Sequence, residues 1–122
     1  ALRRIALNEG HWRHAFPLGR HSVYVFSQTP EEPDNDFAAR MVARGNFEDP
    51  GTGSAAAALI GLLAEKADLA TGQADYVLRQ GHEMGRPCRI TMQLHKEDDV
   101  LVHAAIGGRA VVVGEGVLDL GE

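Results

Sequence analysis

The sequence has a single cysteine, Cys88, among its 122 residues. One thiol excludes an internal disulfide and any metal site built from several cysteines, and it suits a reducing compartment such as the cytoplasm. A long apolar run is also lacking, since the most apolar stretch, residues 55–63, is about half of what a bilayer span requires. No signal-peptide pattern opens the chain. We therefore predict a soluble, cytoplasmic protein without a membrane partner.

Clustered positive charge is missing as well. The 12 lysines and arginines are scattered, with Arg3 and Arg4 as the nearest approach to a cluster, and the formal net charge is −5. A nucleic-acid surface needs gathered basic side chains, so we predict no nucleic-acid partner. The acidic runs at residues 31–32 and 97–99 are typical of solvated turns.

The six histidines do not form a metal-binding pattern. His11 and His14 lie three residues apart, but no carboxylate joins them at ligand spacing. The other four are spread over predicted loops and strands: His21, His82, His95 and His103. We expect no metal site.

Apolar residues make up 44% of the chain, which suffices for one modest core in a single domain. No internal repeat or long linker divides it. The first residue is alanine rather than an initiator methionine, although methionine removal accounts for that equally well. Residues 1–7 predict a short helix that Gly10 ends, and residues 11–20 predict irregular structure.

The rest of the chain predicts strands around one helix. Residues 22–26 are β-branched and aromatic on both faces, which is typical of a buried central strand. Residues 55–66 form a helix that is apolar on nearly every side and so must be enclosed by other structure. Further strands are predicted at residues 37–43, 76–80, 89–95 and 100–106, the last pairing through Gly107-Gly108 with residues 109–113. This is an α+β arrangement.

The most informative stretch is Asp49-Pro50-Gly51-Thr52-Gly53-Ser54, which runs straight into the predicted helix. The first amide groups of a helix lack intrahelical partners, and with the helix dipole they favour a carboxylate or phosphate. A phosphate-binding P-loop would need a lysine, and a dinucleotide fingerprint a third glycine. The alternative is an ordinary glycine turn in which a Ser or Thr caps the helix.

Three segments in order resemble one family. Residues 48–56 (Glu-Asp-Pro-Gly-Thr-Gly-Ser-Ala-Ala) follow Asp-Phe-Ala-Ala-Arg-Met at 36–41, and Gln-Gly-His-Glu-Met-Gly-Arg-Pro stands at 80–87. Residues 106–116 (Ile-Gly-Gly-Arg-Ala-Val-Val-Val-Gly-Glu-Gly) look like a terminal hairpin. Together, from about residue 22 to the end, these segments resemble the PhzF (phenazine-biosynthesis-like) family.

The resemblance implies a diaminopimelate-epimerase-like fold with two α+β halves, each a curved, mostly antiparallel sheet wrapped around a buried central helix. Residues 1–122 would be the C-terminal domain, incomplete at its N-terminal edge. Such proteins are isomerases without metal or organic cofactor that shift a proton on a small carboxylated substrate, using a glutamate of the N-terminal half. We therefore expect homodimers of the whole protein and an inactive isolated fragment.

The resemblance also assigns roles to residues. Asp49 matches the family's active-site aspartate, and its place near a helix start favours the ionised form, which would hold a substrate ammonium or hydroxyl. Ser54 would contact the substrate, and the backbones of Gly51, Thr52 and Gly53 would bind its carboxylate. Possible pocket residues, each also readable as structural, are Gln80, Gly81 and Arg86. Cys88, distant from the loop in sequence, is predicted to be a small buried residue.

Two non-catalytic alternatives remain. The chain could bind a small carboxylate by itself through residues 51–54, without turnover. It could also be an oligomerisation module in which the loop only caps the helix, and then Ser54→Ala would cost about 1 kcal/mol of stability and leave binding unchanged.

Overall fold

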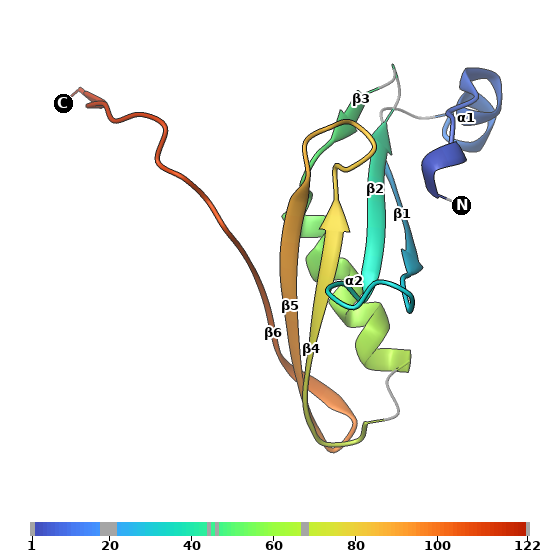
Figure 1. Ribbon diagram of the computed structural model, residues 1–122, viewed down its shortest axis with the longest axis vertical. Coiled ribbons are helices and arrows are strands. Elements are labelled where there is room, and N and C mark those ends of the chain that lie inside the picture. The colour runs from blue at the N-terminus through green and yellow to red at the C-terminus, as the bar shows by residue number, and fades with distance from the viewer. Residues whose placement is uncertain (1, 18–21, 44, 46, 67–68, 122) are drawn as a thin grey trace.

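The computed structural model describes residues 2–17, 22–43, 45, 47–66 and 69–121, which form one sheet and three helical segments (Figure 1). The helical segments are a 3-10 turn η1 (Leu2–Arg4), α1 (Glu9–Ala15) and α2 (Gly53–Lys66). The strands are β1 (Ser22–Gln28), β2 (Phe37–Ala43), β3 (Phe47–Asp49), β4 (Gly72–Gln80), β5 (Cys88–Glu97) and β6 (Val100–Gly108). No helix in the described ranges is long and apolar enough to cross a membrane.

The sheet is mixed but mostly antiparallel. Its order is β1-β2-β4-β5-β6, and β3 pairs with β2 beside that path. Of the five pairs formed by the described strands, only β2 with β4 is parallel. That parallel pair follows from the connection, because α2 lies between β3 and β4 and carries the chain back across the sheet. The predicted α+β class is confirmed, whereas the diaminopimelate-epimerase-like arrangement stays a prediction.

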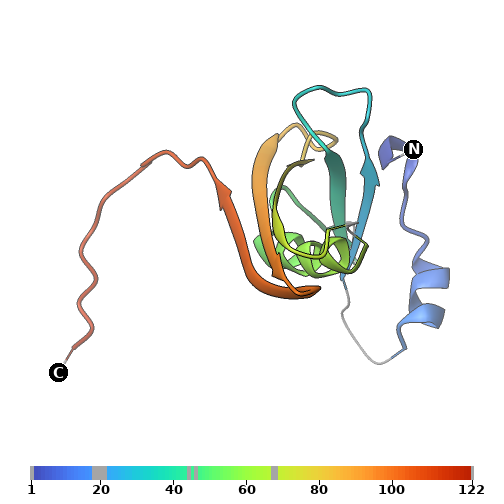
Figure 2. The same cartoon turned by 90° about the horizontal axis from the view of Figure 1, so that it is seen from below.

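The core lies between α2 and the concave face of the sheet, which curves over the helix (Figure 2). From α2, Leu59 and Ile60 point into it, together with Ala56 and Ala64. From the strands come Phe37, Ala39, Leu78, Ile90, Met92 and Leu94. In β5 buried and exposed positions alternate, as the period-2 pattern of its sequence predicts. Burying one leucine, isoleucine, phenylalanine or methionine side chain stabilises the fold by about 1.5–3 kcal/mol.

The other side of α2 is not covered. Ala57 and Ala58 are exposed, and Leu62 keeps 40% of its surface accessible. The expectation that the helix is enclosed on every side is therefore wrong for this chain, because its strands cover one face only. An apolar helix face left in water is a surface that another part of a protein can cover.

The N-terminal prediction is wrong in its boundaries. Residues 2–4 form only a 3-10 turn, and the helix begins at Glu9, inside the region predicted to be irregular. The reason is a helix cap at Asn8, whose side chain accepts a hydrogen bond from the His11 amide at 3.0 Å. Trp12 and Phe16, whose ring centroids are 4.9 Å apart, then pack along the helix. Residues 18–20 lie outside the described residues.

β1 is an edge strand, not the predicted central one. It pairs with β2 alone, over the register from Ser22 opposite Ala43 to Gln28 opposite Phe37. Its residues are half-buried or exposed rather than fully buried. A β-branched and aromatic run shows that both faces of a strand are apolar, but it carries no information on the number of neighbouring strands.

The predicted terminal hairpin is also wrong. Gly107 and Gly108 continue β6 opposite Thr91 and Ile90 rather than forming a turn. The turn that starts β6 is two residues long, Asp98 and Asp99, which adopt the positive φ values (47° and 65°) that such a hairpin turn requires. Residues 109–121, here called the C-terminal arm, form no helix or strand and extend away from the sheet (Figures 1 and 2).

Candidate functional site

The 49–54 loop joins the end of β3 to the start of α2. Asp49 is the last residue of β3, where it lies opposite Met41 of β2, and Gly53 is the first residue of α2. The sheet thus fixes one end of the loop and the helix the other. Gly51 and Ser54 are exposed, and Asp49 is half-buried.

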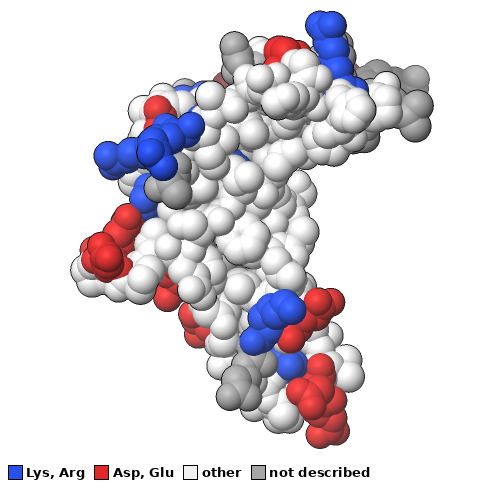
Figure 3. Space-filling model, turned by 90° about the vertical axis from the view of Figure 1, so that its right-hand side faces the viewer, with Lys and Arg blue, Asp and Glu red and all other residues white. Residues whose placement is uncertain are grey.

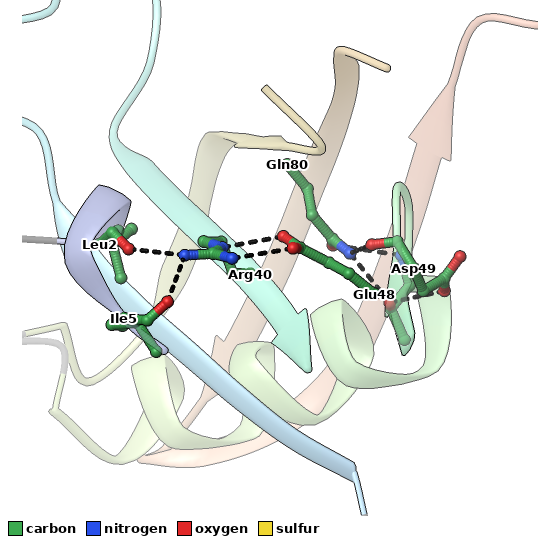
Figure 4. A network of polar contacts seen from close by, with 7 residues as sticks. Leu2, Ile5, Arg40, Glu48, Asp49 and Gln80 are labelled. Atoms are coloured by element: carbon green, nitrogen blue, oxygen red, sulfur yellow. Dashed lines mark hydrogen bonds and ion pairs between the residues drawn. The ribbon is translucent and has the colours of Figure 1, made fainter. Parts of the chain in front are cut away.

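Gln80, at the end of β4, forms the centre of the site. Its side chain is almost fully buried, with 1% of its surface accessible. The amide nitrogen Nε2 donates to the carbonyl oxygen of Asp49 at 2.7 Å and to Oγ1 of Thr52 at 2.9 Å. The amide oxygen Oε1 accepts from the backbone N–H of Thr52 at 3.1 Å. Gln80 was proposed from the sequence as a possible pocket residue. In the structure its buried side chain fixes the loop through these three hydrogen bonds (Figure 4).

Thr52 starts the helix and also contacts the aspartate. Its carbonyl oxygen accepts the first hydrogen bond of α2, from the Ala56 amide at 3.0 Å. Its hydroxyl donates to Oδ2 of Asp49 at 2.7 Å. Thus the hydroxyl of the residue in the capping position orients a carboxylate instead of capping the helix amides.

The donors available to a ligand lie at the first turn of α2. The Thr52 amide is already engaged by Gln80, so it is not free in this structure to bind a substrate carboxylate. By contrast, the amides of Gly53, Ser54 and Ala55 have no acceptor among the residues that the structure describes. Helix geometry leaves these groups unpaired, and with the helix dipole they form a site for an anion.

Gly81 and Gly51 allow close packing around the loop. Gly81 has a φ of +76°, and a Cβ there would overlap with the carbonyl oxygen of Arg86 and lie 2.8 Å from that of Pro50. A Cβ on Gly51 would lie 2.8 Å from Sγ of Cys88. Side chains at either glycine would therefore push the loop away from β4 and β5. Gly81, the second predicted pocket residue, acts here by letting the end of β4 approach the loop.

Cys88 lies beside the loop despite its distance in sequence. The antiparallel pairing of β4 and β5 places Cys88 directly opposite Gln80. The thiol is partly exposed and in contact range of Gly51. The separation of Cys88 from the loop in sequence did not predict their distance in space. The tight turn between β4 and β5 brings Cys88 beside Gln80, and Gln80 binds the loop.

Arg86, the third predicted pocket residue, contributes through its backbone. Its amide donates to the carbonyl oxygen of Gly81 at 2.9 Å and closes the turn between β4 and β5. Its side chain is exposed and makes no hydrogen bond or ion pair with the described residues. It is therefore free to meet a negatively charged group, but the structure does not bring it onto the loop.

Tyr24 of β1 belongs to the site and was missed from the sequence. Its hydroxyl donates to Oε1 of Gln80 at 3.0 Å. Burial raises the pKa of Tyr24 to about 12, with smaller contributions from Cys88 and Asp49, so the phenol stays protonated at neutral pH. A tyrosine in a half-buried strand needs a partner for its hydroxyl. This requirement could have indicated from the sequence that Tyr24 contacts a polar group of the site.

An ion pair supports the loop from the side of β3. Arg40 of β2 binds both carboxylate oxygens of Glu48, each at 2.8 Å, and its Nη1 also donates to the carbonyl oxygens of Leu2 and Ile5 (Figure 4). The guanidinium lowers the pKa of the Glu48 carboxyl, and the same hydrogen bonds raise the pKa of Arg40. The pair fixes β3 just before Asp49 and ties the N-terminal segment to the sheet.

Metal ligands do not gather in the part of the chain that the structure describes, where no three His, Cys, Asp or Glu side chains come together. The chemistry that the described site offers is hydrogen bonding and charge. It combines one oriented carboxylate with unpaired helix amides.

Comparison with known proteins identifies relatives over nearly the whole chain. The chain is 36% identical, over 97% of its length, to an uncharacterized isomerase of Mesorhizobium japonicum, and the match covers 41% of that protein. It is 38% identical, over 82% of its length, to an uncharacterized isomerase of Deinococcus radiodurans, of which 33% is covered.

The chain thus spans about two fifths or less of the length of these curated relatives. The sequence model of the family described as "Phenazine biosynthesis-like protein" matches residues 5–116. That match contains the whole 49–54 loop and every strand of the sheet. The chain therefore belongs to the phenazine biosynthesis-like (PhzF) family.

Proposed function

We propose that this chain is the C-terminal part of a cofactor-independent isomerase or epimerase that moves a proton on a small carboxylated substrate. The observation that carries the proposal is the arrangement of Asp49. One carboxylate oxygen, Oδ2, is held by Thr52, while Oδ1 receives no hydrogen bond from the described residues. The same loop leads from Asp49 into the unpaired amides at the start of α2, so it offers an acceptor and several donors.

This arrangement suits a substrate that carries a carboxylate and a hydrogen-bond donor. The amides of Gly53 and Ser54, with the Ser54 hydroxyl, would receive the carboxylate. Asp49, with its free oxygen, would hold an ammonium or hydroxyl group of the same molecule. In this proposal Asp49 orients the substrate, and the group that transfers the proton is a glutamate in another part of the protein.

Two observations support a second half. The relatives are more than twice as long as the stretch that matches. The chain also exposes apolar side chains that a partner surface would cover, above all in the C-terminal arm: Val111, Val112, Val113, Val117, Leu118 and Leu120 are 81–99% exposed. The side of the molecule that carries β1 has a broad middle without Lys, Arg, Asp or Glu, with such residues mainly toward its two ends (Figure 3). We propose that the N-terminal half covers part of this surface and that the complete protein forms a homodimer.

The test is proton exchange in the complete protein. Small carboxylic acids with an adjacent amino or hydroxyl group are incubated in deuterated water, and incorporation is followed by NMR. We expect incorporation with the complete protein, none with residues 1–122 alone, and a loss of about 100-fold or more in Asp49→Asn, which removes an oriented charge. Full exchange activity in Asp49→Asn would contradict the proposed role.

A carboxylate-binding module without turnover is the second candidate. It is favoured by one observation: the loop, Gln80 and the start of α2 are assembled within this chain alone. Saturable binding of a carboxylate by residues 1–122, combined with no proton exchange in the complete protein, would decide for it.

A further inference from the structure

The buried amide of Gln80 joins β1, β4 and the 49–54 loop. We infer that Gln80, oriented by Tyr24, is a positioning residue that sets the direction of the Thr52 hydroxyl and so holds the Asp49 carboxylate in place for a ligand. The inference rests on the proposed function of the loop and assigns roles to two side chains that need not touch the substrate.

The orientation of the Gln80 amide is fixed by two backbone groups, one that can only donate a hydrogen bond and one that can only accept it. The backbone N–H of Thr52 can only donate, and it lies 3.1 Å from Oε1. The carbonyl oxygen of Asp49 can only accept, and it lies 2.7 Å from Nε2. Exchanging the two ends of the amide would place donor against donor and acceptor against acceptor, so a single orientation satisfies the network.

That orientation determines where the Thr52 proton goes. The second proton of Nε2 points to Oγ1 of Thr52, 2.9 Å away, so Oγ1 is an acceptor on that side. The hydroxyl has one hydrogen, and the remaining partner is Oδ2 of Asp49 at 2.7 Å. Oδ2 is therefore engaged, whereas Oδ1 receives no hydrogen bond from the described residues. Gln80 lies behind this pair and is too buried to meet a ligand directly.

Tyr24 completes the arrangement from the neighbouring strand. Its hydroxyl donates to Oε1 of Gln80, which thereby accepts two hydrogen bonds, one from Tyr24 and one from Thr52. A carbonyl oxygen has two lone pairs, so both are used. This contact couples β1, the edge strand, to the loop at the start of α2.

The experiment compares two ligands in the complete protein. Anthranilate has a carboxylate and an amino group, and benzoate lacks the amino group, so the ratio of their affinities, measured by calorimetry, reports on Asp49. The variants are Gln80→Met, which keeps the volume but no hydrogen bonds, and Gln80→Glu. Gln73→Glu is the matched control on the same strand, since Gln73 is exposed and its side chain bonds, among the described residues, only to Asp75.

We expect Gln80→Met to lower the affinity for anthranilate by about tenfold, and that for benzoate less, since the Thr52 hydroxyl that holds Asp49 is no longer oriented. Gln80→Glu should behave like Gln80→Met at neutral pH and regain only part of the affinity in mild acid, because a protonated carboxyl has one O–H in place of the two N–H groups of Gln80. Gln73→Glu should bind as the original protein does. A folded Gln80→Met variant with unchanged affinity ratio would overturn the inference.

If the original protein binds neither ligand, the proposed function fails, and the positioning role is then decided by NMR without ligand. The two side-chain amide protons of Gln80 should exchange with water far more slowly than those of Gln73. Thr52→Val should shift one of the two Gln80 signals. Exchange as fast as that of Gln73 would show that the network does not form.

Discussion

The 49–54 loop and the C-terminal arm both follow strands of the sheet. They differ in whether their side chains and backbone groups contact the rest of the chain. Gln80 binds the loop at three atoms, the Asp49 carbonyl oxygen and the amide and hydroxyl of Thr52, and the Thr52 hydroxyl holds Asp49 in turn. The arm leaves its valines and leucines in water. The loop is thus fixed by polar contacts within this chain, whereas the apolar side chains of the arm are exposed.

Matched leucine truncations should give the largest contrast between the two regions. Leu78 has no accessible surface, whereas Leu120 is 85% exposed. In residues 1–122, Leu78→Ala should lower the free energy of unfolding by about 2–5 kcal/mol because it leaves a cavity. Leu120→Ala should change it by less than about 0.5 kcal/mol. Urea denaturation of both variants measures the difference.

Measuring Leu78→Ala and Leu120→Ala in the complete protein tests whether the C-terminal arm is covered there. If a second half covers the arm, Leu120→Ala should there cost a measurable part of the stability, about 1 kcal/mol or more. An equally small effect in both contexts would mean that the arm stays in water.

Two glycines in one turn test how closely the loop is packed. Gly81 and Gly85 both have positive φ, +76° and +72°, but only at Gly81 does a Cβ meet neighbouring atoms. Gly85→Ala should cost about 1 kcal/mol for backbone strain. Gly81→Ala should cost about 1–3 kcal/mol more, since its Cβ would also meet the carbonyl oxygens of Arg86 in the turn and of Pro50 in the loop. Thermal unfolding of the two variants gives the difference, and equal losses would show that the loop yields freely.

The Arg40–Glu48 pair predicts a pH dependence of stability. The pKa of Glu48 is lowered from its ordinary value of 4.5 in the folded chain. The contribution is therefore complete above that ordinary value and is lost as the pH falls through the lowered one. Side-chain exposures of 12% and 16% place the pair at the edge of the core, and we expect about 1 kcal/mol. Denaturation of Glu48→Gln and the original protein should show the full loss at pH 7 and a loss that shrinks steadily as the pH is lowered below 4.5.

Ser54→Ala should have the smallest effect on stability. Thr52, not Ser54, occupies the capping position, and Ser54 is exposed. We expect a change within about 0.5 kcal/mol, together with weaker carboxylate binding in the complete protein. A loss of 1 kcal/mol or more without any change in binding would favour a purely structural role for the loop.

Local patterns predicted several elements well. β2, most of β4, β5 and α2 lie where the alternation and the apolar run placed them, and burial alternates along β5. The 49–54 loop was found from its glycines and its position before a helix. The start of α1 was missed because one residue, Asn8, decides it through its side chain.

The sequence by itself determined the family, the strands and helix of the core, and the loop that carries Asp49. Each follows from a local feature of the chain: the hydrophobic period, the placement of glycines and the order of the motifs. The tertiary structure alone decided that β1 is an edge, that Gly107 and Gly108 continue a strand, and that Tyr24, Gln80 and Cys88 meet at the loop. Those outcomes depend on which strands become neighbours. Pairing between distant segments is set by the packing of the whole sheet on α2, which no local pattern records.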